Sequence, residues 1–300
     1  MKTFLSIFIF CIVLFLYIHI HFHLKTSDDL EVYEIESPTK PSLEDICDIR
    51  QPVTFSLQNE QILNICNRQS ILDKYGTFEI NMRNVTHEIN TNDCTSLHMP
   101  IQLHNGLRIV KEDNNSTYIS ENNQDFLKET GVSKILRVND LLLRPYMVCK
   151  TIYDILFGSK LSSTPLKYNI NYRNFFYVSE GAVKVKLIPP RSSKYLSVEK
   201  DYFNFEFRSN INPWNVQEKY KNNYSKAQTL EVEIKKGEML FVPAYWWYSI
   251  QFLDSSTTVV SMQYRTYMNV IATLPYFAMC VLQRQNTKLD LSQLTKSVLS

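Results

Sequence analysis

The chain has 300 residues, which is enough for one large domain or two small ones with a sizeable core. Its 32 Lys and Arg residues nearly balance 30 Asp and Glu residues, and no long run of one sign indicates a nucleic-acid surface. The 18 Tyr and 17 Phe against only six Gly favour a strand-rich, aromatic interior over a glycine-rich nucleotide-binding fold. We therefore expect a mainly β protein that binds no nucleic acid.

Residues 1–25 predict a signal-anchor transmembrane helix. No side chain between Phe4 and Leu24 carries a formal charge when His is neutral, and a helix of this length spans about 30 Å, the thickness of a bilayer core. The apolar run exceeds that of a cleavable signal peptide and continues to Lys25. We expect a single-pass membrane protein that contacts the membrane through this helix. Lysines on both sides leave its orientation open.

Residues 26–42 are acidic and interrupted by prolines, which predicts a stalk between the membrane and a folded domain. The domain is expected over residues 43–266. In its first part, "LEDICDIRQPVTF" predicts a short helix and a strand, and "DKYGTFEINMRNV" predicts a further strand. "ENNQDFLKETGVSKIL" predicts a helix that ends at Gly131.

Two later stretches predict pairs of strands. "NFFYVSEGAVKVKLIPP" has the pattern of a β-hairpin that turns at Glu180 and Gly181, and its second half alternates apolar side chains with lysines. "LEVEIKKGEMLFV" predicts another pair around Gly237, and "TTVVSMQYRT" predicts one more strand. Residues 267–300 predict a C-terminal helical extension that Pro275 kinks or restarts. This extension is expected to pack on the domain or to pair two subunits in a homodimer.

The six cysteines are widely spread and form no CxxC pair, which excludes the usual zinc-finger and thioredoxin motifs. Scattered buried thiols are the expected arrangement. A disulfide between Cys47 and Cys66 is the alternative in an oxidising compartment.

Two stretches carry a family resemblance: "DILFGSKLSSTPLKYNINYRNFFYVSEGAVKVKLIPP" and "KGEMLFVPAYWWYSIQF". They resemble the two halves of the metal site in JmjC-type cupins, in particular the asparaginyl-hydroxylase branch. The resemblance implies a double-stranded β-helix with flanking helices and chemistry that depends on Fe(II) and 2-oxoglutarate. The N-terminal anchor, "LEVYEIE", "FEFRSNINPWN" and "AYWWYSI" are most similar to membrane-anchored cupin-like proteins of large DNA viruses. That similarity implies a host or virion membrane and no established activity.

The residues at the family's metal positions depart from its pattern. A non-haem iron oxygenase of this kind holds its metal with two histidines and one carboxylate. Counted from "TPLKYN", the first His and the Asp fall on Lys167 and Asn169; counted back from Asn174, they fall on Tyr168 and Ile170. Neither alignment supplies a histidine and an acid, so the metal site is expected to be degenerate.

The second histidine of the family falls on Tyr248, a phenol that is a poor ligand at neutral pH. Thr164 matches a residue that contacts the co-substrate in the family, whereas the family's strand lysine falls on Val183. We expect no metal ligand, no catalytic residue and no cofactor, with Fe(II) and 2-oxoglutarate as the disfavoured alternative. Because strand residues alternate, Trp246 and Tyr248 share a face that Trp247 does not. The pocket candidates are Thr164, Lys167, Tyr168, Asn169, Asn174, Trp246 and Tyr248.

Other polar residues are weaker candidates for chemistry. His87, His98 and His104 precede the matched strands at irregular spacing, which is not a metal motif. Glu180 and Glu238 lie at predicted turns, where hydrogen bonding is the simpler role.

Two classes of function remain. The first is a catalytically inert cupin that acts as a membrane-tethered binding or scaffold module for an unknown protein or small molecule. The second is a divergent enzyme, either with a pocket for a carbohydrate or peptide or with 2-oxoglutarate oxygenase activity through replacement ligands. An open polar cavity at the candidate residues would favour ligand binding, whereas a filled one would favour a scaffold.

Overall fold

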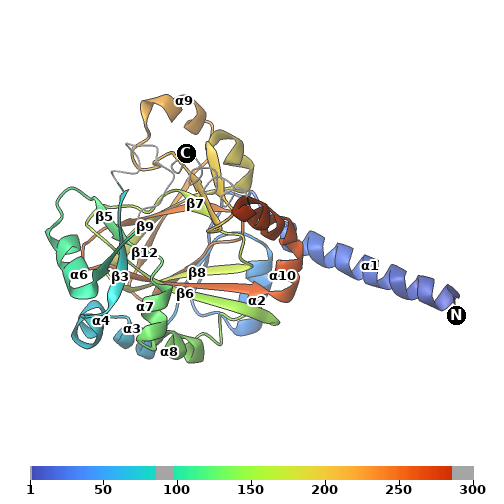
Figure 1. Cartoon of the computed structure of the whole chain (residues 1–300), viewed down its shortest axis with the longest axis horizontal. Coiled ribbons are helices and arrows are strands. Elements are labelled where there is room, and N and C mark those ends of the chain that lie inside the picture. The colour runs from blue at the N-terminus through green and yellow to red at the C-terminus, as the bar shows by residue number, and fades with distance from the viewer. Residues whose placement is uncertain (1, 86–97, 286–300) are drawn as a thin grey trace, which may run out of the picture.

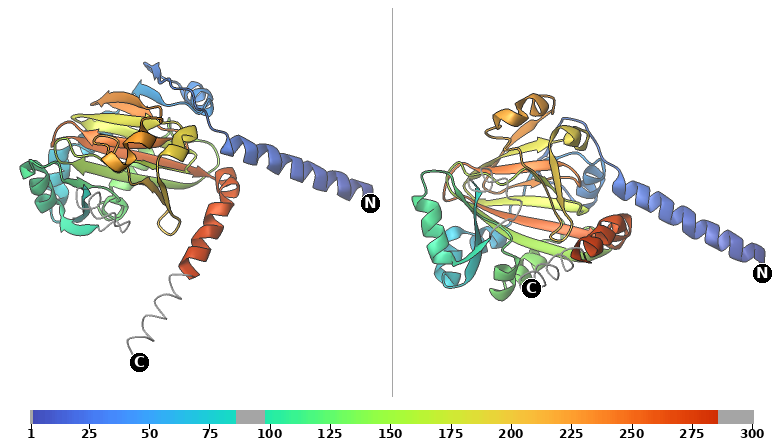
Figure 2. Two further views of the ribbon diagram at one scale, coloured as in Figure 1. Left: turned by 90° about the horizontal axis from the view of Figure 1, so that it is seen from above. Right: turned by 45° about the horizontal axis from the view of Figure 1, so that its top comes forward.

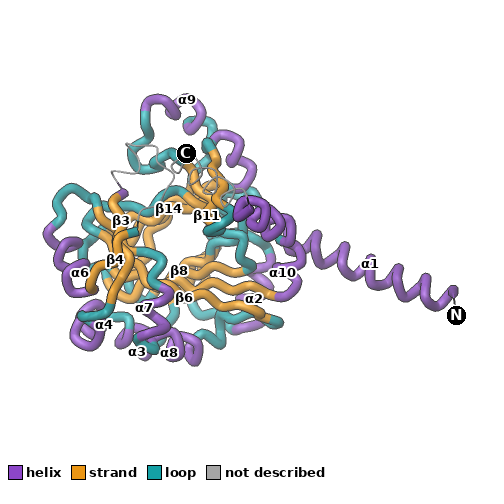
Figure 3. Tube along the Cα trace, in the orientation of Figure 1, coloured by secondary structure: helices purple, strands orange, loops and turns teal. Residues whose placement is uncertain are grey.

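Two facing β-sheets form the centre of the molecule (Figures 1 and 3). The computed structural model describes residues 2–85 and 98–285. Within these residues, one sheet has nine strands in the order β1-β2-β13-β8-β15-β6-β5-β3-β4, and the other has six in the order β10-β11-β7-β14-β9-β12. The mainly β, cupin-like fold expected from the sequence is confirmed.

The larger sheet contains β1 (Tyr33–Ile35), β2 (Val53–Ser56), β3 (Glu79–Asn84), β4 (Met99–Gln102), β5 (Tyr118–Ser120), β6 (Val148–Gly158), β8 (Arg173–Glu180), β13 (Glu238–Phe241) and β15 (Thr258–Thr266). The smaller sheet contains β7 (Lys167–Tyr168), β9 (Ala182–Ile188), β10 (Val198–Asp201), β11 (Glu206–Ser209), β12 (Leu230–Lys235) and β14 (Trp247–Phe252).

The predicted hairpin around Gly181 is wrong, because its two strands lie in different sheets. β8 pairs with β13 and β15 in the larger sheet, whereas β9 pairs with β12 and β14 in the smaller one. Gly181 adopts φ +74°, which lets the chain cross between the sheets where a Cβ would meet Thr257. The strands on either side of Gly237 are likewise divided, with β12 in one sheet and β13 in the other. This exchange of sheets at each turn produces the double-stranded β-helix.

Both faces of the larger sheet are buried, as alternating residues of β8 show. Phe175 and Tyr177 belong to an apolar cluster with the helices on the outer face, and Phe176 and Val178 belong to a second cluster between the sheets. Helices cover the outer face, as Figure 1 shows. The helices are α2 (Lys40–Asp48), α3 (Glu60–Ile65), α4 (Arg68–Tyr75), α6 (Leu103–Glu112), α7 (Gln124–Glu129) and α8 (Val132–Asn139).

The smaller sheet buries its inner face and the part of its outer face around Trp247. Tyr248 lies in the cluster between the sheets and Trp247 in a third cluster on the outer face. Short helices lie along this side, namely the 3-10 helices Pro190–Tyr195 and Glu218–Tyr220 and the helix α9 (Lys221–Tyr224). On β9, Lys184 and Lys186 point away from the core toward Glu231, as the alternating sequence predicts.

The N-terminal helix α1 (Lys2–Leu24) projects from the domain (Figure 1). It is long and apolar enough to cross a membrane, a property that signal sequences share. Its last turn docks on the domain, where His23 is buried and its Nε2 lies 3.3 Å from Thr266 Oγ1.

The predicted stalk over residues 26–42 is part of the domain instead of a free spacer. β1 pairs in parallel with β2, and α2 begins at Lys40, inside the predicted stalk. The Asp29 carboxylate accepts a hydrogen bond from Gln51 Nε2 at 2.8 Å. The acidic composition suits both arrangements, because an edge strand exposes its charged side chains to water.

The C-terminal segment breaks where proline was expected to act. α10 (Tyr267–Ala272) is capped by Thr273, and residues 274–285 form a second helix that contains Pro275 in its first turn. Tyr276 and Phe277 pack on Phe207 and Phe205 of the domain.

The described cysteines are free, so the alternative disulfide between Cys47 and Cys66 is not formed. Cys47, Cys66 and Cys280 are buried, as expected, whereas Cys11 and Cys149 are exposed. Cys94 lies outside the described residues.

Candidate functional site

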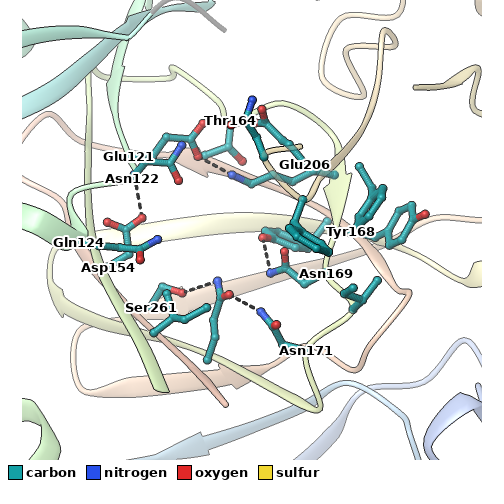
Figure 4. A pocket seen from close by; sticks show the side chains of 18 of the residues that line it. Glu121, Asn122, Gln124, Asp154, Thr164, Tyr168, Asn169, Asn171, Glu206 and Ser261 are labelled. Atoms are coloured by element: carbon teal, nitrogen blue, oxygen red, sulfur yellow. Dashed lines mark hydrogen bonds and ion pairs between the residues drawn. The ribbon is translucent and has the colours of Figure 1, made fainter. Parts of the chain in front are cut away.

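A cavity of about 460 Å³ opens between the two sheets (Figure 4). Its walls come from β6, β7, β8, β11, β14 and β15 and from the segment that precedes α7. Amides, hydroxyls and carboxylates supply much of the lining, while Leu156 and Phe176 supply part of its apolar wall. The cavity is therefore open and polar, which is the arrangement that favours a ligand.

Five of the seven predicted pocket residues line this cavity, namely Thr164, Lys167, Tyr168, Asn169 and Tyr248. Asn174 does not line it, because its Nδ2 donates hydrogen bonds to the carbonyl oxygens of Asn171 and Val242 in the interior. Trp246 does not line it either and is fully buried in the cluster between the sheets. Sharing a strand face with Tyr248 was therefore insufficient to bring Trp246 to the cavity.

The structure resolves the two alignments that the sequence left open. Lys167 of β7 pairs with Tyr248 of β14, which brings both side chains to the cavity, and Asn169 joins them two residues on. Tyr168 contributes to the wall but stacks on Phe207 and packs against Trp247 on the outer side. Ile170 also lines the cavity and, like Tyr168, belongs to the apolar cluster on the outer side. The positions counted from "TPLKYN" are the ones that lie beside Tyr248, by strand pairing for Lys167 and by a hydrogen bond for Asn169.

Lys167 belongs to a buried network of charged side chains. Its Nζ lies 2.5 Å from Glu121 Oε2, and Glu121 Oε1 lies 2.5 Å from Arg83 Nη1. Arg83 also reaches Glu206, at 3.4 Å. Burial alone would raise the pKa of Glu121, but the charges of Lys167 and Arg83 lower it to about 2. Burial likewise opposes the charge on Lys167, and Glu121 overcomes this and raises the pKa of the ammonium.

Asn169 and Tyr248, which match the family's carboxylate and second histidine, are joined by a hydrogen bond. Asn169 Nδ2 donates to Tyr248 Oη at 3.0 Å (Figure 4). Burial raises the pKa of Tyr248 to about 12, so the phenol is neutral at physiological pH. The ring of Tyr248 packs against Phe176, with centroids 5.0 Å apart.

Asp154 adds a carboxyl group on the wall formed by β6. It accepts hydrogen bonds from the backbone nitrogens of Asn122 and Asn123 at 2.9 and 2.6 Å. Burial raises the pKa of Asp154 to about 6 in spite of these donors. Asp154 therefore changes charge within the cavity near pH 6.

A row of amides lies along β15 and the segment after β7. Asn171 Nδ2 donates to Gln263 Oε1 at 2.6 Å, and Gln263 Nε2 donates to Ser261 Oγ at 3.2 Å (Figure 4). Arg265 donates through Nε to Asn171 Oδ1. These groups offer a ligand both hydrogen-bond donors and acceptors, and they do not form a cluster of like charges.

Glu121, Arg83 and Asp154 were not predicted as site residues from the sequence. Glu121 precedes a predicted helix, and Arg83 and Asp154 lie on strands whose places in the sheet the sequence did not define. The contact from Glu121 to Lys167 joins residues 46 positions apart in the chain. No spacing motif signals such a contact.

The donor set does not fit Fe(II). Lys167 is a cation, and Asn169 and Tyr248 are neutral groups that already bond to one another. A site for Fe(II) in this family needs imidazoles and a carboxylate on one face. Among residues 2–85 and 98–285, no group of three His, Cys, Asp or Glu side chains is arranged to hold a metal.

The histidine candidates do not restore a metal site. His98 lines the cavity, where burial lowers the pKa of its imidazole. His104 lies on α6 with an exposed side chain, and His87 lies outside the described residues. Glu180 and Glu238 accept hydrogen bonds from backbone nitrogens at turns, at 3.0 and 2.8 Å.

The family's binding mode for 2-oxoglutarate is also altered. Val183, at the position of the family's lysine, lies in the apolar cluster between the sheets. Lys186 points outward and donates to the Pro213 carbonyl oxygen at 3.0 Å. Thr164 keeps its hydroxyl at the cavity, but this oxygen already accepts a hydrogen bond from the Ile250 backbone nitrogen at 2.9 Å.

Comparison with known proteins agrees with this architecture. HSPB1-associated protein 1 of Homo sapiens and that of Rattus norvegicus are each 28% identical to this chain over 105 residues, which are 35% of this chain and 22% of the relative. The Bos taurus protein is 27% identical over the same length. The matched segment thus spans about a fifth of these relatives. The sequence model of the cupin-like domain family matches residues 50–269 of this chain. The chain therefore belongs to this family of JmjC-type cupins.

Proposed function

We propose that this protein is a metal-independent cupin that binds a small polar ligand between its two sheets and is held at a membrane by α1. The observation that carries the proposal is the state of the former metal positions. An ion pair and a hydrogen bond tie up Lys167, Asn169 and Tyr248, yet about 460 Å³ of cavity remains beside them. An open polar cavity of this size favours ligand binding over a purely scaffolding role.

The lining favours a ligand that is polar and carries little net charge. Lys167 is neutralised by Glu121, and Arg265 donates to Asn171 and lies 5.4 Å from the Phe205 ring centroid. Hydrogen-bonding amides and hydroxyls with an aromatic wall are the groups that recognise a carbohydrate ring or a peptide segment. These two ligand classes are the ones to test first.

The location at a membrane is supported by the length and apolar character of α1 and by the resemblance to membrane-anchored viral cupins. The same resemblance suggests a host or virion membrane. Extraction of membranes with alkaline carbonate tests the anchor, because a protein held only by surface contacts is released and one with a membrane-spanning helix is retained.

Oxygenase activity through replacement ligands is the second candidate, and the donor set disfavours it. The test is the metal content of the full chain, purified anaerobically in detergent with added Fe(II) and 2-oxoglutarate. We expect far less than one iron per chain. The matched variant Lys167→His/Asn169→Asp/Tyr248→His restores the family's ligand types and is expected to retain iron. Stoichiometric iron in the unmodified chain would refute metal independence.

Ligand binding is tested with the same protein by thermal shift against neutral monosaccharides and capped dipeptides, with 2-oxoglutarate as the comparison. A hit must also bind more weakly to Gln263→Ala, which removes an amide from the cavity wall. If ligands stabilise both proteins equally, they bind elsewhere.

A further inference from the structure

A second cavity, of about 560 Å³, lies on the outer face of the smaller sheet beside the end of α1. Leu24, the last residue of α1, forms part of its wall. Trp247 and Tyr276 contribute aromatic surface, and Tyr168 separates this cavity from the one between the sheets. The cavity is thus an apolar site next to the point where α1 would leave a membrane.

The rim of this cavity is basic. Lys194 and Lys200 both line it and have exposed side chains. Within the described part of the chain, neither forms a salt bridge, and the Lys194 ammonium lies 5.0 Å from the Tyr195 ring centroid. Two cations are therefore available to an anionic group at the mouth of the cavity.

Tyr245 lines the cavity and offers it an unpaired hydroxyl. Its hydroxyl is buried, and in the residues that the structure describes it has no hydrogen-bond partner. The backbone of Tyr245 adopts φ +68°, a left-handed conformation that costs free energy in a residue other than glycine. A buried donor without a partner is unfavourable unless water or a ligand in the cavity supplies one.

The helix of residues 274–285 extends this surface. Tyr276 and Phe277 anchor one side of it on the domain, while an exposed apolar set lies on the rest of the helix: Leu274, Met279, Val281 and Leu282. Figure 2 shows this helix running across the direction of α1, close to its base. A helix with this placement would lie along the surface of a membrane that α1 crosses.

From these observations we propose that the second cavity binds an anionic membrane phospholipid. Lys194 and Lys200 contact the phosphate, the Tyr245 hydroxyl donates to a phosphate or ester oxygen, and the aromatic wall receives the glycerol and upper acyl chains. The inference rests on the proposed anchoring of α1, because that anchoring brings the cavity to the level of the lipid headgroups.

The test is calorimetric titration of the detergent-purified full chain with three probes. The probes are dihexanoyl phosphatidic acid, dihexanoyl phosphatidylcholine and inorganic phosphate. We expect phosphatidic acid to bind at least about tenfold more tightly than either of the others. Lys194→Gln/Lys200→Gln should weaken its binding about tenfold, because both charges at the mouth are lost.

Two further variants complete the design. Tyr245→Phe removes only the hydroxyl and should weaken phosphatidic acid binding severalfold. Lys111→Gln/Lys236→Gln makes the same change in net charge at exposed lysines that do not line the cavity and should alter binding less than twofold. Unchanged binding in the Lys194/Lys200 variant would overturn the assignment of the site.

If inorganic phosphate binds as tightly as phosphatidic acid, the cavity is an anion site and the lipid assignment is wrong. If phosphatidylcholine binds as tightly as phosphatidic acid, the proposed preference for an anionic headgroup is wrong. Carbonate extraction reports on the anchor separately. Release of the protein from membranes with intact calorimetric selectivity would refute the anchoring of α1, whereas a retained protein without selectivity would refute the lipid site.

Discussion

The Asn169 side-chain amide lies 3.0 Å from the Tyr248 phenol oxygen and donates a hydrogen bond to it. The two residues stand at positions where a JmjC-type iron site would have a carboxylate and a histidine. This hydrogen bond joins two neutral groups at the cavity wall, which is a donor set that suits a polar ligand better than Fe(II).

Tyr248→Phe should reduce stability by about 1 kcal/mol, because it removes this hydrogen bond and keeps the ring. Chemical denaturation of the detergent-solubilised chain measures the change. The matched control is Tyr146→Phe, which removes a hydroxyl from a ring that is 69% exposed and should cost far less. Equal losses in both variants would show that the bond to Asn169 contributes nothing.

Glu121→Gln should be more damaging, at about 3 to 5 kcal/mol, because it leaves the buried charges of Lys167 and Arg83 without their shared partner. The exposed Glu129→Gln provides the control. The pKa of Glu121 is lowered to about 2 in the folded state, so its contribution is present above the unfolded value near 4.5. That contribution should disappear as the pH falls from about 4.5 to about 2, and the variant should not show this loss.

The contribution of Asp154 to stability should change with pH in the opposite direction to that of Glu121. Its pKa rises from 3.8 in the unfolded chain to about 6 in the folded protein, so the folded state binds the proton more strongly. The stabilisation from this proton is complete below about pH 3.8 and is lost as the pH rises through 6. Relative to Asp154→Asn, the wild type should therefore lose stability between pH 4 and pH 7, with a slope of at most about 1.4 kcal/mol per pH unit.

Denaturation of both proteins at pH 4.5, 5.5, 6.5 and 7.5 checks this prediction, since other titrating groups are present in both and largely cancel. Parallel stability curves over this range would contradict a raised pKa for Asp154.

The sequence predicted the local features well because alternation and motif spacing are local. The pattern at Trp246, Trp247 and Tyr248 assigned the inner and outer faces of β14, and the position of Pro275 indicated where the C-terminal helix restarts. The residues that match the family's metal positions could be named because the family resemblance supplied the spacing.

Pairing and long-range contacts could not be predicted from the same patterns. The apolar alternation of β9 fixes which side chains point inward but leaves its partner strands open, and the hairpin prediction failed for this reason. Glu121 reaches Lys167 and Arg83 only after three separate segments fold together. The acidic segment at β1 has the composition of a spacer, while three residues of parallel pairing attach it to the sheet.

The crossing between the sheets should depend on Gly181. Gly181 and Gly131 both adopt φ +74°, so alanine at either position pays the left-handed penalty of about 1 to 2 kcal/mol. A Cβ at Gly131 meets nothing within 4 Å, whereas one at Gly181 would lie 3.0 Å from Thr257 Cα and closer still to its hydroxyl. Gly181→Ala should therefore destabilise the protein clearly more than Gly131→Ala in denaturant titrations. Equal costs would mean that the left-handed backbone alone, and not the close approach of Thr257, requires glycine at this crossing.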